Sequence, residues 1–247
     1  MEKNFISERY LGVYQRNRLE TALIALTVRG FGDYKVDLGP SPTIIDTGAH
    51  IGIAALDFLS RHPGVKLTCV EPDPDNVVLL KKNLELFPGV KIIEAAVSSE
   101  TGESLLSVSP NGWSWGNSLH HQYSGTESIM VSTTTLSSLV EGRVDLLKID
   151  IEGSEVEAIE ELSDHPDEAS RVNQMVIEFH PREVSCSLED FLDTLETLGF
   201  KNKIGAGIRV ARIPSFLASV CDSIKMPVVI HSKRRPPQKI ISIPLTR

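Results

Sequence analysis

Two patterns of apolar residues alternate along the chain. Short unbroken apolar runs are typical of buried strands, and apolar residues recurring every three or four positions are typical of helices that bury one face. The runs predict strands over residues 43–46, 66–71, 90–97, 144–151 and 175–180. Strands separated by helices predict an α/β fold with βαβ units, a mostly parallel sheet and helices on both of its faces.

The predicted helices begin and end at residues that suit helix ends. Asp73 and Pro74 suit the N-cap and first turn of a helix that follows the second strand. Gly199 follows a helix whose apolar face includes Leu188 and Leu195, and glycine is favoured directly after a helix. These boundaries support the strand and helix assignment.

Residues 1–40 precede the first predicted strand and contain a further helix that ends at Gly30. Its predicted apolar face consists of Leu19, Ala22, Leu23 and Leu26. We expect residues 1–40 to form an N-terminal helical cap that packs on a main domain of residues 41–247.

The segment 98–135 is rich in Ser, Thr and Gly, with strands predicted over residues 104–108 and 128–134. The long loop between them carries Trp113, Trp115 and Tyr123. These aromatic residues suit either a lid over an acceptor molecule or burial against the N-terminal cap. Near the C-terminus, residues 227–231 predict a last strand, antiparallel at the sheet edge.

Composition and charge narrow the class of protein. The 247 residues are 41% hydrophobic and 23% charged, which fits one large globular domain. The net charge of −8 disfavours a general nucleic-acid binder, because an acidic surface repels phosphates. No apolar stretch approaches the roughly 20 residues that span a bilayer, and no apolar signal core begins the chain. We expect a cytoplasmic protein without membrane association.

Two smaller features complete the composition. Basic residues gather between His231 and Lys239, and we expect this stretch to form a solvated tail. The three cysteines, Cys69, Cys186 and Cys221, are odd in number and widely spaced, which predicts neither a disulfide nor a zinc site.

The loop after the first predicted strand suits a bound ligand. Gly48 and Gly52 allow a sharp turn and a close approach, and the next helix presents its N-terminal amides nearby. The spacing is G-x-x-x-G, not the G-x-G-x-x-G of dinucleotide-binding proteins. Glu71 ends the second strand 23 residues after Gly48, where a carboxylate can accept hydrogen bonds from both ribose hydroxyls. Together these features predict adenosine binding.

Charged residues also mark the ends of the fourth and fifth predicted strands. Lys148 and Asp150 point to one face of a strand that is otherwise apolar, which predicts either a structural ion pair or a ligand site. Glu178 and His180 share a face at the end of the fifth strand. We expect Asp150, Glu178 and His180 to converge over the site.

The segments IIDTGAHIG, VEPDP, VDLLKIDIEGSE and VIEFH resemble the FkbM family of S-adenosylmethionine-dependent methyltransferases over residues 43–200. The resemblance implies a class I methyltransferase fold, which is Rossmann-like, with a seven-stranded sheet whose last hairpin is reversed. It also implies that S-adenosylmethionine is the cofactor. The acceptor that it implies is usually a hydroxyl of a small molecule, natural product or sugar.

The resemblance also places the cofactor residue by residue. It puts Asp46, Gly48 and Gly52 beside the methionine part, Glu71 at the ribose, Glu94, Ala95 and Ala96 at the adenine, and Asp150 beside the sulfonium. Ala49, His50 and Pro72 are also expected to contact the cofactor. Two positions depart from the family pattern, because His50 replaces an asparagine and Ser137 stands where an aspartate is common. Both departures affect the expected details of substrate contact.

Methyl transfer to a hydroxyl requires a group that removes its proton. His180 is the favoured general base because an imidazole titrates near neutral pH, with Asp150 or Glu178 orienting it or acting directly. A His180 held by a backbone carbonyl is the structural alternative, and His120 and His121 are further candidates. Asp150 and Glu178 could instead hold a divalent metal, although no dedicated ligand spacing is visible and we predict none.

Two other functions fit parts of the sequence. An NAD-dependent oxidoreductase would also have a Rossmann-type domain, but the absent G-x-G turn argues against it. A non-catalytic descendant that keeps the fold and binds the cofactor is the second alternative.

Overall fold

The computed structural model describes residues 8–10, 13–31, 34–109, 114, 116–120, 128–180, 186–205 and 227–235 of the chain. Several residues of the sequence analysis lie outside these ranges, namely Trp113, Trp115, His121, Tyr123, Cys221 and Lys239. Within the described residues, no helix is long and apolar enough to cross a membrane.

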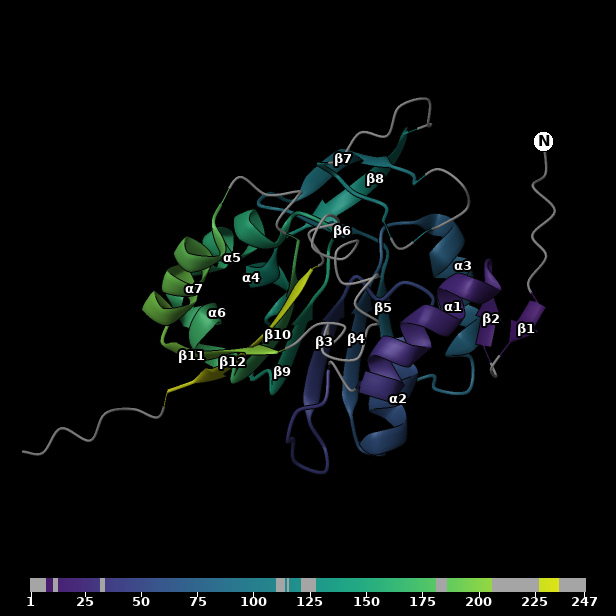
Figure 1. The fold of residues 1–247 in the computed structure, drawn as a ribbon, viewed down its shortest axis with the longest axis horizontal. Coiled ribbons are helices and arrows are strands. Elements are labelled where there is room, and N and C mark those ends of the chain that lie inside the picture. The colour runs from purple at the N-terminus through teal and green to yellow at the C-terminus, as the bar shows by residue number, and fades with distance from the viewer. Residues whose placement is uncertain are drawn as a thin grey trace, which may run out of the picture.

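A seven-stranded sheet forms the centre of the molecule, in the order β11–β12–β10–β9–β3–β4–β5 (Figure 1). Its strands are β3 (Thr43–Thr47), β4 (Lys66–Val70), β5 (Lys91–Ile93), β9 (Leu146–Ile149), β10 (Gln174–Phe179), β11 (Phe200–Gly205) and β12 (Val228–Arg234). β12 runs antiparallel to both of its neighbours, and the other paired strands are parallel. This order, with a reversed last hairpin, confirms the predicted class I methyltransferase fold.

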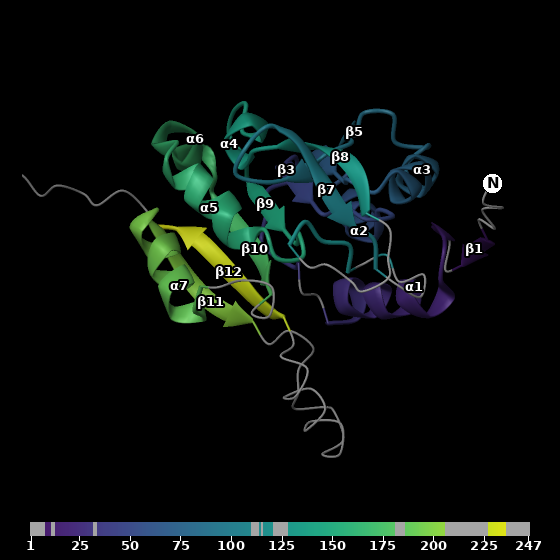
Figure 2. The same cartoon turned by 90° about the horizontal axis from the view of Figure 1, so that it is seen from above.

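Helices cover both faces of this sheet (Figure 2). They are α2 (Ile53–Arg61) and α3 (Pro74–Asn83) on one face, and α4 (Leu136–Leu139), α5 (Glu155–Ser163), α6 (Pro166–Arg171) and α7 (Leu188–Thr197) on the other. Successive strand residues point to opposite faces. Ile44 of β3 therefore packs with Phe58 and Leu80, whereas its neighbour Ile45 belongs to the cluster that contains Ile159 and Phe191.

The segment predicted as one strand over residues 90–97 is two strands in different sheets. β5 ends at Ile93, and β6 (Ala96–Val97) joins a small sheet with β7 (Gly102–Ser107) and β8 (Ser128–Thr134) in the order β6–β8–β7. Glu94 is exposed between the two strands and pairs with Lys81. The chain leaves the main sheet here because residues 96–97 pair with β8 instead.

The N-terminal part comprises β1 (Glu8–Tyr10), β2 (Val13–Gln15), α1 (Arg18–Ala25) and a π-helical turn, η1 (Leu26–Phe31). The predicted apolar face of the helix is wrong, because Leu19, Leu23 and Leu26 are 58%, 37% and 48% exposed. The inward face instead carries Glu20, which is buried against Ser114. Because the buried face includes the polar residue Glu20, the pattern of hydrophobic residues does not reveal it. The division into a cap and a main domain stays a prediction.

β12 differs from its prediction in length and in place. It lies between β10 and β11 rather than at the sheet edge, and it extends to Arg234. The Arg234 guanidinium donates hydrogen bonds to the carbonyl oxygens of Ala169, Val172 and Leu198. The prediction of a solvated tail is therefore wrong from His231 to Arg234, because these residues complete the sheet.

Candidate active site

A cavity of about 410 Å³ opens at the carboxyl ends of β3, β4, β9 and β10. The strand order reverses between β3 and β9, and open α/β sheets bind ligands at such a switch point. Most predicted site residues line the cavity: Gly48, Ala49, His50, Glu71, Pro72, Ala95, Ala96, Asp150, Glu178 and His180. Asp46 and Gly52 are not part of its lining.

The two glycines of the turn allow close contacts with different parts of the structure. Both have left-handed backbone angles, with φ of 73° at Gly48 and 91° at Gly52. A Cβ atom on Gly48 would lie 1.7 Å from the backbone oxygen of Asp150, so this glycine lets the ends of β3 and β9 meet. A Cβ atom on Gly52 would lie 2.8 Å from Cδ1 of Leu80, so this glycine serves the packing of α3.

His50 lies in the same turn and also has a left-handed φ, of 51°. Among residues other than glycine, Asn and His adopt this conformation with less strain than most, which accounts for either residue at this position. The imidazole Nε2 lies 2.7 Å from Oγ of Ser114. Burial lowers the pKa of His50 to about 4, so the ring is neutral at physiological pH.

Glu71 is buried at the end of β4, with only 5% of its surface exposed. Its carboxylate accepts hydrogen bonds from the backbone amides of His50 (2.8 Å) and Asp73 (3.1 Å) and from Nδ2 of Asn76 (3.1 Å). Burial is the main reason that its pKa rises to about 7. The three donors hold the carboxylate at the place that the sequence predicts for the ribose.

Lys148 is almost fully buried and forms part of the cavity lining. Its Nζ lies 3.0 Å from Oδ1 of Asp46 and 3.4 Å from Oδ2 of Asp150, and it donates to the carbonyl oxygens of Thr47 and Gly48. The ion pair considered for Lys148 and Asp150 is therefore present, with Asp46 as the nearer partner. Asp46 is wholly buried in this pair.

Tyr34 joins two of the predicted catalytic carboxylates. Its hydroxyl oxygen lies 3.0 Å from Oδ2 of Asp150 and 3.0 Å from Oε2 of Glu178. The hydroxyl has one proton to donate, so two hydrogen bonds require a second proton on a carboxyl group. Burial and the charge of Asp150 raise the pKa of Glu178 to about 7. Tyr34 was not predicted from the sequence, because it stands in an irregular segment without a hydrophobic pattern.

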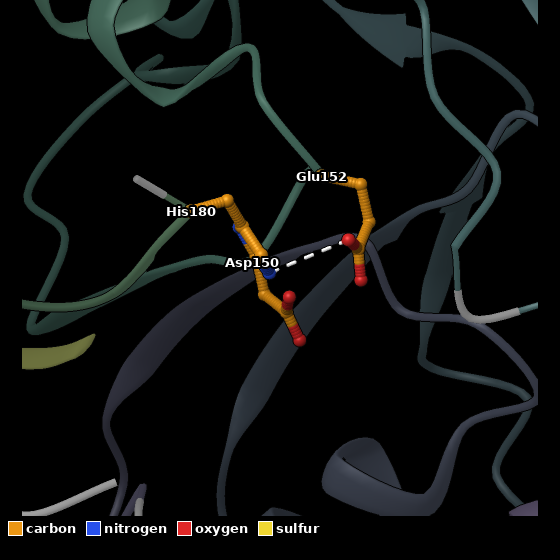
Figure 3. A group of neighbouring side chains, drawn as sticks. All are labelled: Asp150, Glu152 and His180. Atoms are coloured by element: carbon orange, nitrogen blue, oxygen red, sulfur yellow. Dashed lines mark ion pairs between the residues drawn. The ribbon is translucent and has the colours of Figure 1, made fainter. Parts of the chain in front are cut away.

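His180 is 8% exposed and is held by glutamates rather than by the partners expected from sequence. Its Nδ1 lies 2.7 Å from Oε1 of Glu155, and its Nε2 lies 3.4 Å from Oε2 of Glu152 (Figure 3). Burial lowers the pKa of His180, but the two carboxylates outweigh it and raise the pKa well above its usual value. Glu155 and Glu152, rather than Asp150 or Glu178, therefore orient the ring, and the role of His180 as general base stays a prediction. No backbone carbonyl among the described residues holds the ring.

Glu152 and Glu155 belong to the KIDIEGSE segment but were not among the predicted site residues. Glu152 has a left-handed φ of 51°, and the turn directs its carboxylate toward His180 (Figure 3). Burial is the main cause that raises the pKa of Glu152 to about 8. Ligand atoms of Asp150, Glu152 and His180 lie within 4.8 Å of one another, which is a spacing that could hold a metal ion.

Like Asp46 and Gly52, His120 and Ser137 lie outside the cavity lining. His120 pairs with Glu157, with 3.3 Å between Nε2 and Oε1. Ser137 lies at the start of α4, where the family commonly has an aspartate, and it donates a hydrogen bond to Glu161 of α5.

Comparisons with known proteins identify the family of this chain. The model of the Methyltransferase FkbM domain matches residues 46–202. Methyltransferase sdnD of Sordaria araneosa is 27% identical, over 74% of this chain and 84% of its own. Two of the solved structures that resemble this chain have lower identity.

One of these structures is the precorrin-6y C5,15-methyltransferase of Geobacter metallireducens, with 15% identity and a TM-score of 0.47 over 85% of this chain and 88% of that one. The other is the ribosomal protein L11 methylase of Lactobacillus delbrueckii subsp. bulgaricus, with 14% identity and a TM-score of 0.43 over 92% and 83%. Because the family match spans more than half of the chain and includes the glycine turn, Glu71 and the K-I-D-x-E-G strand, the protein belongs to the FkbM-domain methyltransferases, whose methyl donor is S-adenosylmethionine.

Proposed function

We propose that the protein transfers a methyl group to a hydroxyl oxygen of a mainly apolar small molecule, such as a natural product or a sugar derivative. The observation that carries the proposal is the hydrogen-bonded set of Tyr34, Asp150 and Glu178 at the switch point of the sheet. These oxygen atoms can hold a hydroxyl and accept its proton next to the expected place of the methyl donor.

The lining residues fit S-adenosylmethionine. Glu71 offers carboxylate oxygens to the two ribose hydroxyls, and Ala95 and Ala96 leave a small apolar wall for the adenine. The turn at Gly48 and Ala49 lies beside Asp150, whose negative charge suits a positive sulfonium. When bound, the cofactor supplies an activated methyl group.

The remaining walls of the cavity are mostly apolar. Ile24, Thr27 and Val28 come from the N-terminal helices, Leu106 comes from β7, and Val229 comes from β12. Apolar walls with a few polar groups are typical of sites for small molecules. An acceptor with an apolar body and one hydroxyl that reaches Tyr34 would satisfy both parts of the lining.

The chain contributes alignment and proton removal. The acceptor oxygen forms a bond to the methyl carbon while the bond from that carbon to sulfur breaks. The hydroxyl proton passes to a carboxylate oxygen of Asp150 or Glu178, and Tyr34 holds the two carboxylates in place. A proton acceptor next to the reacting oxygen distinguishes this arrangement from a site that only binds the cofactor.

The test is a methylation screen with S-adenosylmethionine that carries an isotopically labelled methyl group. Hydroxylated apolar small molecules are offered beside matched amines and matched analogues that lack the hydroxyl. We expect label in an ether product of the hydroxylated compounds alone. Methylation of the amines alone would overturn the proposal. Cofactor binding without methylation of any class would favour the non-catalytic alternative.

A further inference from the structure

We propose that Asp150, Glu152 and His180 bind a small divalent cation in the cavity, where it would contact the acceptor hydroxyl. Cation binding stands on the geometry of this chain alone. Its part in methyl transfer rests on the proposed function.

The three side chains follow two neighbouring strands and lie close to one another (Figure 3). Asp150 follows β9 directly, Glu152 lies in the turn after it, and His180 follows β10. One ligand atom from each lies within 4.8 Å of the other two, and all three residues line the cavity. Three protein ligands leave coordination positions for water and for an acceptor oxygen, as catalytic metal sites require.

The orientation of His180 is the second observation, and it depends on a residue outside the ligand set. Glu155 is wholly buried, and its carboxylate oxygens accept from the backbone amide of Gly153 at 3.1 and 3.2 Å. One of these oxygens lies 2.7 Å from Nδ1 of His180. Metal-bound histidines usually donate their second ring nitrogen to a carboxylate in this way. The ring thereby presents Nε2 toward Glu152.

The balance of charge around the cavity also favours a cation. The carboxylates of Asp150, Glu152 and Glu178 line the cavity. Lys148 Nζ lies 3.4 Å from Oδ2 of Asp150, but it also pairs with the wholly buried Asp46 at 3.0 Å, so one ammonium group is shared by two carboxylates. Buried carboxylates without matching positive charge are costly. A divalent cation between Asp150 and Glu152 would offset that cost more completely than the His180 imidazole does.

The donor set selects among cations. Calcium takes six to eight oxygen ligands, and an imidazole nitrogen is not among the ligands that it favours. Imidazole suits first-row transition ions and zinc, whereas carboxylates suit manganese and magnesium. One imidazole and two carboxylates therefore fit Mn²⁺ or Zn²⁺ best.

The test measures Mn²⁺ binding to the full chain after treatment with a chelator, by calorimetry and by electron paramagnetic resonance of the free ion. We expect one site, and an affinity at least about tenfold weaker in Glu152→Gln and in His180→Gln. Glu155→Gln should weaken binding about 10- to 100-fold by releasing the ring. Glu157→Gln is the matched control, because Glu157 lies on the same helix but pairs with His120.

Equal affinity in the wild type and Glu152→Gln would overturn the proposal, as would an equal loss in Glu157→Gln. If Glu152→Gln does not fold, a measurement on the wild type still tests the site. Binding of diamagnetic Zn²⁺ should then shift the ¹⁵N resonance of Nε2 in His180, and an unchanged resonance would overturn the site.

The two proposals fail in different ways. If methylation continues in the presence of a chelator and in Glu152→Gln, the cation has no part in methyl transfer, and the proposed function stays intact. Mn²⁺ binding that depends on Glu152 and His180, together with no methylation of any hydroxyl, would support the cation site and remove the proposed function.

Discussion

The hydroxyl of Tyr34 lies 3.0 Å from Oε2 of Glu178, although 144 residues separate them in the sequence. The same oxygen lies 3.0 Å from Asp150. Tyr34 comes from the segment between η1 and β3, so this contact ties the N-terminal part of the chain to the carboxyl ends of β9 and β10. The N-terminal part thereby contributes directly to the candidate active site.

Replacing Tyr34 with phenylalanine should lower kcat by at least about tenfold, because both carboxylates lose the hydroxyl that holds them. The affinity for S-adenosylhomocysteine should stay unchanged, since its neutral sulfur is not attracted to Asp150 and, among the described residues, Tyr34 makes no hydrogen bond to Glu71 or Gly48. Steady-state kinetics and a ligand titration measure both quantities. Tyr14→Phe is the control, because only the backbone of Tyr14 bonds to Asn83. Equal kcat in Tyr34→Phe and the wild type would contradict the assigned role.

The pKa of Glu71, raised to about 7 by burial, makes ligand binding depend on pH. Its carboxylate is disfavoured in the empty folded protein, so its ionisation lowers the stability of that protein as the pH rises from about 4.5 to about 7. Ribose hydroxyls donate to the ionised form. Affinity should therefore rise about tenfold between pH 6 and pH 8.

S-Adenosylhomocysteine is the ligand for this measurement, because its neutral sulfur removes the attraction of the other carboxylates from the result. Calorimetric titrations of the wild type should show the rise in affinity, and Glu71→Gln should abolish it. Glu94→Gln serves as the control, since Glu94 is exposed and paired with Lys81. A pH dependence that persists in Glu71→Gln would assign it to another group.

The sequence predicted the sheet and the floor of the cavity well, because both depend on local patterns. Apolar runs located β3, β4, β5, β9 and β10, although β11 was not predicted, and the glycine turn and Glu71 follow strands directly. The division of residues 90–97 was missed, since the pairing partner of Ala96 is Thr133 in β8. Nothing near Ala96 in the sequence reports that distant pairing.

The chemistry of His180 depended on contacts that no local pattern reveals. Its usual pKa suggested a general base, but Glu152 and Glu155 surround the ring. These glutamates reach it because the chain turns through left-handed angles at Glu152 and Gly153, with φ of 51° and 106°. Two successive left-handed residues are not predictable from a hydrophobic pattern, so the partners of His180 were not predictable either.

Alanine at position 48 should destabilise the protein by about 3 kcal/mol or more. The left-handed φ costs about 1 to 2 kcal/mol for any residue with a Cβ atom, and the contact with the Asp150 oxygen adds to it. Urea unfolding measures the loss, with Gly89→Ala as the control, because no atom lies within 4 Å of a Cβ at that site. Equal stability of the two variants would contradict the close approach of β3 and β9.

Lys148→Met tests the buried ion pair with Asp46. The substitution leaves the wholly buried Asp46 without its cation, and breaking such a pair costs about 3 to 5 kcal/mol. The double variant Lys148→Met with Asp46→Asn should regain most of the lost free energy of unfolding, because no buried charge then remains at position 46. Lys91→Met is the control, since Lys91 pairs with Glu141 on the surface and should contribute less than about 1 kcal/mol. If the double variant is less stable than Lys148→Met alone, the cost does not come from an unpaired Asp46, and Asp46 has a role apart from Lys148.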